Sequence, residues 1–147
     1  MLFLAGLLAA AAVSVVRAAD SSPLTIARGG MQIEVHIGFA GLFRPGFWTP
    51  LTLVLSNQGP DRRGLLEVSV PGGSELDDDV HALVHRRTLD LAKGATKRVR
   101  FNVYVASVGR PLTVRFKERP DGSPPFAVEG TVSLRERFSE RELVVVL

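Results

Sequence analysis

Two runs of alternating apolar and polar residues, Met31 to Phe39 and Leu51 to Ser56, are joined by the stretch Gly41-Leu42-Phe43-Arg44-Pro45-Gly46-Phe47-Trp48-Thr49-Pro50. This stretch contains two prolines, two glycines and the only tryptophan of the chain. Proline fixes φ and lacks an N–H donor, whereas glycine tolerates a positive φ, so such a stretch interrupts a strand. The order strand, ordered connection, strand therefore predicts an antiparallel β protein.

The same period-two alternation recurs along the rest of the chain, with turn residues such as Asn57 to Asp61 and Pro120 to Ser123 between the runs. Residues 80–91 fit either one bent strand or two short strands, and residues 71–79 fit a polar loop. The predicted inward-facing residues are Met31, Ile33, Val35, Ile37, Phe39, Leu51, Leu53, Leu55, Leu66, Val68, Val70, Val99, Phe101, Val103, Val105, Leu112, Val114, Phe116, Phe126, Val128, Val132 and Leu134. About seven short strands without helical periodicity predict an all-β fold, an immunoglobulin-like antiparallel β-sandwich over residues 31–134.

The N-terminus has the composition of an export signal. Leu2 to Val16 is apolar and uncharged, too short to span a bilayer comfortably, and Val16-Arg17-Ala18 offers a small-residue cleavage site. We therefore expect a signal helix and signal peptide over residues 1–18 and a short linker over residues 19–30. The alternative is an uncleaved anchor, because no lysine or arginine precedes the apolar run.

The composition of the chain also indicates where the protein is located. The chain has 147 residues, a formal net charge of +3 and no cysteine. An exported domain of this size without disulfides must be stabilised by its core alone, which suits a bacterial protein. The expected location is the periplasm or the outer face of the bacterial cytoplasmic membrane.

The C-terminal residues follow a different pattern. Residues 135–142 are rich in charge, and Leu143 to Leu147 is apolar without alternation. A strand that is apolar on both faces is typical of a covered parallel sheet. Residues 135–147 are therefore interpreted as a charged linker and the first strand of a missing or following α/β domain. The alternative is a last strand that closes the sandwich.

The sequence gives no sign of an active site. His81 and His85 lie four residues apart, which on a strand separates them by about 13 Å, too far for one metal ion. The nearby run Asp77 to Asp79 lacks the ligand spacing of a calcium loop. Cysteine, a Gly-x-Ser-x-Gly motif and a glycine-rich phosphate loop are all absent. We expect no enzyme activity, catalytic residue, metal, cofactor or small-molecule substrate.

Several basic residues occupy the outward half of a strand alternation, among them Arg98 and Arg100. Export argues against a nucleic-acid partner, whereas an anionic membrane surface fits a basic sheet face. Trp48 is expected to pack in the core or cover an edge in preference to forming a ligand platform. Arg44 fits either of two roles, in which it binds loop carbonyls or contacts a partner.

The connection and a second segment together resemble the N-terminal region of large membrane-anchored bacterial proteins. That region carries a G-x-(Y/F)-(R/K)-P-G-x-W-x-P stretch, matched here from Gly41 to Pro50, and an L-x-x-G-x-x-(K/R)-(K/R) turn, similar to Leu89 to Val99. In these proteins the β-sandwich is followed by an α/β domain, which resembles class I glutamine amidotransferases. A transmembrane anchor follows that domain. The resemblance implies that the present chain is one sandwich module of such a protein.

Taken together, the residues predict a non-catalytic exported accessory module, a spacer or docking domain of the cell envelope. Its expected partner is a protein or the missing C-terminal domain. The alternative is a ligand-binding sandwich for cell-wall glycan or lipid headgroups. The candidate interaction residues are Arg44, Phe47, Trp48, Arg98, Arg100, Leu143 and Val145.

Overall fold

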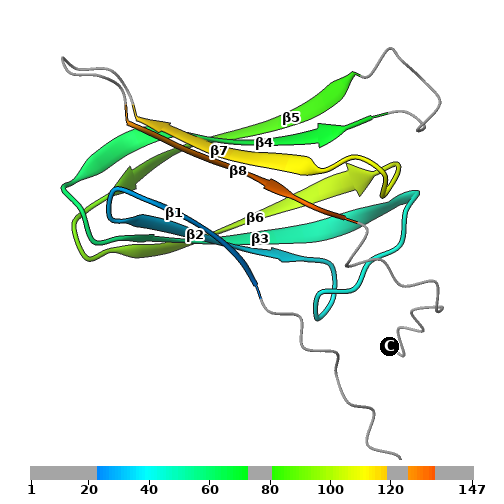
Figure 1. The fold of residues 1–147 in the computed structure, drawn as a ribbon, viewed down its shortest axis with the longest axis horizontal. Coiled ribbons are helices and arrows are strands. Elements are labelled where there is room, and N and C mark those ends of the chain that lie inside the picture. Colours follow the sequence, from blue (N-terminus) through cyan, green and yellow to red (C-terminus); the bar gives the residue numbers. More distant parts are fainter. Residues whose placement is uncertain (1–22, 73–80, 119–125, 135–147) are drawn as a thin grey trace, which may run out of the picture.

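The computed structural model describes residues 23–72, 81–118 and 126–134. These residues form two four-stranded antiparallel sheets that pack face to face as a β-sandwich (Figure 1). The first sheet has the order β1-β2-β3-β6 and the second has the order β5-β4-β7-β8. The strands are β1 (Leu24–Arg28), β2 (Met31–Ile37), β3 (Phe47–Asn57), β4 (Arg62–Pro71), β5 (Ala82–Leu91), β6 (Thr96–Val105), β7 (Leu112–Glu118) and β8 (Ala127–Val132).

Each connection is either a hairpin within one sheet or a crossing from one sheet to the other. Hairpins join β1 to β2, β2 to β3, β4 to β5 and β7 to β8, whereas β3–β4, β5–β6 and β6–β7 pass between the sheets. The all-β, immunoglobulin-like sandwich predicted from the alternation is confirmed. The described residues contain eight strands where about seven were predicted, and residues 82–91 form a single strand.

The additional strand is β1, which occupies part of the linker predicted over residues 19–30. It pairs antiparallel with β2 from Leu24↔Val35 to Arg28↔Met31. Ile26 lies so close to Gly130 of β8 that a Cβ at Gly130 would be 2.6 Å from the Ile26 side chain. The linker interpretation is therefore wrong over Leu24–Arg28, because these residues close one side of the sandwich by packing the edge of β1 on β8.

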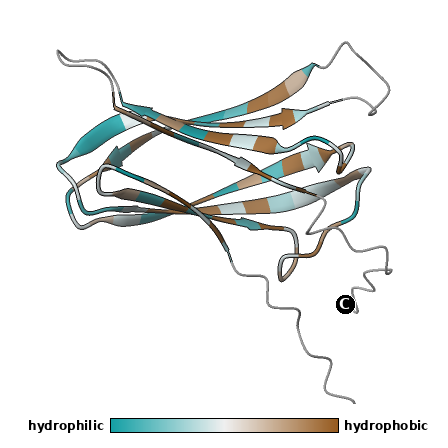
Figure 2. Cartoon of the chain, in the orientation of Figure 1, coloured by the Kyte–Doolittle hydropathy of each residue, from teal (hydrophilic) through white to brown (hydrophobic). Residues whose placement is uncertain are grey.

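The core lies between the sheets and consists of the inward half of each alternation. Along the strands this alternation appears as bands of hydrophobic and hydrophilic residues (Figure 2). Most predicted inward residues are buried, and Phe101 and Phe126 pack partly buried against them. Phe39 is the exception, because it follows the end of β2 and is 58% exposed. The largest fully buried side chains are Phe43, Phe116, Met31, Ile33, Ile37, Leu51, Leu53, Leu55, Leu66, Leu91, Leu112 and Leu134.

Strand β3 begins at Phe47, four residues before the predicted start at Leu51. Pro50 is tolerated inside it for a geometric reason. The Pro50 carbonyl accepts a hydrogen bond from the Gly38 amide at 2.8 Å, so the backbone polar groups of Pro50 face β2 and not β6. Pairing with β2 ends at Ile37↔Leu51, and the missing N–H of Pro50 therefore breaks no ladder bond.

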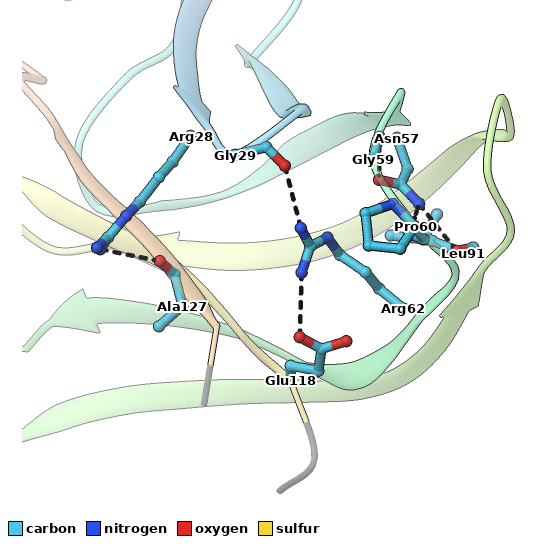
Figure 3. Close-up of polar contacts among 9 residues, drawn as sticks. All are labelled: Arg28, Gly29, Asn57, Gly59, Pro60, Arg62, Leu91, Glu118 and Ala127. Carbon is cyan, nitrogen blue, oxygen red and sulfur yellow. Dashed lines mark hydrogen bonds and ion pairs between the residues drawn. The ribbon is translucent and has the colours of Figure 1, made fainter. Parts of the chain in front are cut away.

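Arg62 ties together the end of the sandwich opposite the β2–β3 connection (Figure 3). Its guanidinium bonds a Glu118 carboxylate oxygen and the Gly29 carbonyl, both at 3.0 Å, and stacks 3.5 Å above the Phe126 ring. Beside it, Arg28 donates a hydrogen bond to the Ala127 carbonyl at 3.2 Å. The half-buried contacts of Arg62 and the exposed contact of Arg28 link the first sheet to the second, so we assign this end a structural role.

The two exposed edges, β5 and β6, lie on the same side of the sandwich. Charged side chains protect this side. Arg87 lies on the inner face of β5, and its guanidinium is 5.6 Å from the centroid of the Phe101 ring of β6. An inward-pointing charge on an edge strand opposes pairing with another chain, since pairing would desolvate that charge.

Several predictions concern residues outside the described ranges. They are the signal peptide over residues 1–18, most of the polar loop over residues 71–79, the turn at 120–123 and the C-terminal segment over residues 135–147. The described part of the chain includes no helix of the length and hydrophobicity needed to cross a bilayer.

Candidate interaction surface

The β2–β3 connection, residues 38–46, is held by backbone hydrogen bonds at both of its ends. Phe39 and Leu42 exchange N–H···O bonds of 2.8 and 2.9 Å, and the Gly46 amide donates to the Val105 carbonyl at 2.8 Å. The Phe43 side chain is buried in the core and anchors the middle of the connection. Four of its residues have positive φ, namely Gly38, Ala40, Gly41 and Gly46. The connection is therefore an ordered turn fixed to the rim of the sandwich.

This turn and the adjacent strand ends display large apolar side chains to solvent. We call this set the aromatic patch, and it consists of Phe39 (58% exposed), Leu42 (37%), Phe47 (57%), Trp48 (65%) and Tyr104 (37%). Exposed apolar groups clustered at one end of a domain mark an interaction site, especially when a rigid scaffold positions them. Of the two packing roles expected for Trp48, the core position is wrong, because its side chain lies on the outer face of β3, away from the core.

Aromatic contacts within the patch fix its geometry. Trp48 of β3 is paired with Tyr104 of β6, and their ring centroids are 5.8 Å apart with an interplanar angle of 60°. The Arg44 guanidinium lies 5.4 Å from the Phe47 ring centroid, within the range of a cation–π contact. This contact with Phe47 is neither of the two roles considered for Arg44, which were binding of loop carbonyls and contact with a partner.

Two arginines continue the same surface along β6. Arg98 and Arg100 share the outward alternation with Tyr104, so they lie on the outer face of the first sheet with Trp48. Both are exposed, and neither has an ion pair with any residue that the structure describes. The same face also carries Glu34 and His36 on β2, with 3.8 Å between the Glu34 Oε2 and His36 Nε2 atoms.

The outer face of the second sheet has a contrasting arrangement. Arg86, Glu67, Arg115 and Glu129 form a row across β5, β4, β7 and β8, in which the sign of the charge alternates. Arg86 bonds Glu67 at 2.7 Å, and Arg115 bonds Glu129. The hydrogen bond from Arg86 lowers the pKa of Glu67 below its ordinary value. The charges of this row are thus neutralised within the sheet.

Two shallow hollows among the described residues are lined by charged side chains. One, of about 340 Å³, is lined by side chains of the charged row together with Ser69 and Thr113. Another, of about 280 Å³, is lined by Arg62, Glu118, Arg63 and Asp90, among others. The structure describes no group of three histidine, aspartate or glutamate side chains placed to hold a metal ion.

The structure brings most of the predicted interaction residues together. Arg44 and Phe47 meet in the turn, and Trp48, Arg98 and Arg100 share one face. Leu143 and Val145 lie outside the described residues. Sequence reasoning did not assign Phe39, Leu42 and Tyr104 to the site. The available signal was the outward alternation of Tyr104 with Arg98 and Arg100, which places all three on one face.

A model of a protein family, described as a domain of unknown function (DUF8726), matches residues 30–135. The chain belongs to this family. The DUF8726 match runs from the start of β2 through β8, so it contains the aromatic patch and both sheet faces but leaves out β1. No curated protein matches the sequence.

Among solved structures, the chain is similar to the sporulation control protein Spo0M from Bacillus subtilis. The likeness has a TM-score of 0.41 at 11% sequence identity and covers 72% of this chain. It covers 49% of the Spo0M chain, so the DUF8726 chain spans about half the length of that protein.

Proposed function

We propose that this chain is a non-catalytic interaction module of the bacterial cell envelope, exported by its N-terminal segment. The observation that supports this role most strongly is the aromatic patch on an ordered turn, beside Arg98 and Arg100, which have no ion-pair partner among the described residues. The hydrophobic effect favours covering these side chains, and hydrogen bonding already fixes their positions. A partner that covers the patch would therefore bind without having to order the loop first.

The position of the patch suits a module within a longer assembly. Strand β1 begins and β8 ends at the same end of the sandwich as the β2–β3 connection (Figure 1). A domain attached after Leu134 would therefore join the sandwich beside the aromatic patch. This arrangement supports the partner classes expected for a docking module, which are a following domain, another envelope protein or the envelope surface itself.

A second candidate function is binding of cell-wall glycan, and one observation favours it. Trp48 is exposed, as a sugar-stacking residue must be. The 60° angle between Trp48 and Tyr104 weakens this candidate, since the two rings do not form one flat platform for a polymer. We therefore rank it below docking on a protein or membrane surface.

Sedimentation with washed bacterial envelopes tests the proposed function. The protein from Ala19 onward contains all described strands, and it should sediment with envelopes that hold both membrane and cell wall. The double substitution Leu42→Ser and Trp48→Ser should weaken this association about tenfold or more, because it removes two exposed anchors of the kind that dominate binding energy. Binding is measured as the fraction of protein in the pellet over a range of envelope concentrations.

The matched control is the double substitution Leu83→Ser and Val84→Ser. These residues are 48% and 43% exposed on β5 of the second sheet, whereas the patch lies on the turn and the first sheet. The control should bind as well as the wild type. Equal weakening by both pairs would contradict docking through the patch, and circular dichroism establishes that each variant is folded.

A further inference from the structure

We infer that the outer face of the first sheet, together with the projecting β2–β3 connection, binds the surface of an anionic lipid bilayer. This inference rests on the proposed function and names the partner of the same surface. The proposed partner is the headgroup and interfacial layer of the bilayer. The basic side chains contact the lipid phosphates, and the apolar side chains lie just below them.

Charge distribution is the first observation. On the outer face of the second sheet, Arg86 and Arg115 each have a carboxylate partner. On the outer face of the first sheet, Arg98 and Arg100 have none among the described residues. A cation without an internal partner keeps its full attraction for an external anion, worth about 1 kcal/mol per basic residue near an anionic membrane.

The acidic residue on the same face does not cancel this attraction. Glu34 accepts a hydrogen bond from Gln32 at 3.2 Å and lies 3.8 Å from His36. In the register, Glu34 and Arg98 both flank Val54 of β3, on opposite sides. Arg98 and Arg100 thus form a positive strip along the outer β6 edge, and Glu34 lies across the sheet from it.

Side-chain type is the second observation. Phe39 and Leu42 occupy the turn, and Trp48 and Tyr104 occupy the strand ends behind it. Tryptophan and tyrosine favour the headgroup level of a bilayer, because their rings are amphipathic. Phenylalanine and leucine favour the acyl boundary, about 5–10 Å into the interface. The order from the turn to the strands matches the polarity gradient that a protein meets at a membrane surface.

The relative position of these groups is the third observation. The β2–β3 connection lies below the first sheet, on the side away from the second sheet (Figure 1). The turn therefore projects on the same side as Trp48 and the two arginines. Arg100 is four residues from Tyr104, a distance of about 13 Å along β6. A bilayer parallel to the sheet would contact the turn, the aromatic pair and both arginines at once.

Fluorescence of the single tryptophan tests this inference with protein-free vesicles. The probes are vesicles of phosphatidylglycerol and phosphatidylcholine in equal parts, and vesicles of phosphatidylcholine alone. Addition of the anionic vesicles to the protein from Ala19 onward should shift Trp48 emission to the blue, and the neutral vesicles should cause little shift. Raising the salt concentration to about 0.5 M, where the screening length is roughly 4 Å, should weaken binding.

Charge variants make the test specific to the surface. Arg98→Gln with Arg100→Gln should weaken binding to the anionic vesicles about 25-fold, or about fivefold for each residue. The control pair Arg63→Gln with Lys93→Gln changes the net charge equally. Arg63 is paired with Asp90 on the opposite face, and Lys93 follows β5 in the turn at the opposite end. This control should lose less than about twofold.

Three outcomes would overturn the inference. The first is equal loss in both pairs, which would assign binding to net charge alone, and the second is equal binding to neutral vesicles. The third is binding to envelopes without binding to either vesicle, which would assign the patch to a protein or glycan and leave the proposed function standing. Failure to bind envelopes at all would instead refute the proposed function.

Discussion

Replacing Asn57 by alanine is expected to lower the free energy of unfolding by about 3–4 kcal/mol. Asn57 is fully buried at the end of β3, opposite the aromatic patch. Its side-chain amide donates to the carbonyls of Pro60 at 2.7 Å and Leu91 at 3.1 Å (Figure 3). It also donates to the Ala92 carbonyl at 3.3 Å. Its side-chain oxygen accepts a hydrogen bond from the Gly59 amide at 3.1 Å.

The expected loss of stability is large because alanine cannot make the hydrogen bonds of the Asn57 side chain. The amide links the β3–β4 connection to the end of β5, so it joins the two sheets. Removing the Asn57 amide leaves buried backbone groups without hydrogen-bond partners, and each such group costs about 1–3 kcal/mol of stability. The control is Asn102→Ala, because Asn102 is exposed on β6 and should change stability by less than about 0.5 kcal/mol. Urea unfolding of both variants measures the difference, and similar losses would contradict the assignment.

Replacing Gly38 by alanine is expected to cost about 3 kcal/mol of stability, because it distorts the turn that presents the patch. Gly38 has a φ of 70°, and a Cβ added there would lie 1.9 Å from the Leu42 carbonyl oxygen. Real Cβ atoms do not approach an oxygen so closely, so the Phe39–Leu42 bridge must open.

Gly46 supplies a matched control within the same turn. Its φ is 79°, but a Cβ added there would meet nothing within 4 Å. Gly46→Ala should therefore cost only the backbone strain, about 1 kcal/mol. Thermal or urea unfolding of the two variants measures the difference. Equal losses would contradict the close contact at Gly38 and show that the positive φ alone decides stability there.

Much of the fold could be predicted because each strand has one buried face. Strand β6 illustrates this point, since Val99, Val103 and Val105 are buried exactly in the predicted alternation with exposed residues. Strand β1 could not be predicted in the same way. Leu24 and Ile26 are only partly buried, and the partner that decides their position is the remote Gly130. Short edge strands depend on tertiary neighbours that local periodicity does not encode.

The candidate site could be predicted in its residue types but not in its arrangement. Phe39 continues the inward alternation of β2, yet the positive φ of Gly38 ends the strand before it. Trp48 was expected to pack in the core or cover an edge, because tryptophan is usually well buried. The Trp48 side chain points outward because β3 already begins at Phe47. This start was not predicted, because the prolines and glycines nearby indicated a turn up to Pro50. The pairing of Trp48 with Tyr104 depends on a β3–β6 register that no local pattern specifies.

The measurement that tests docking through the aromatic patch most directly is acrylamide quenching of Trp48, the only tryptophan of the chain. In the free protein we predict ready quenching, because the side chain is 65% exposed. On washed envelopes the quenching constant should fall several-fold as a partner covers the ring. Unchanged quenching of envelope-bound protein, or a ring already shielded in the free protein, would contradict the account.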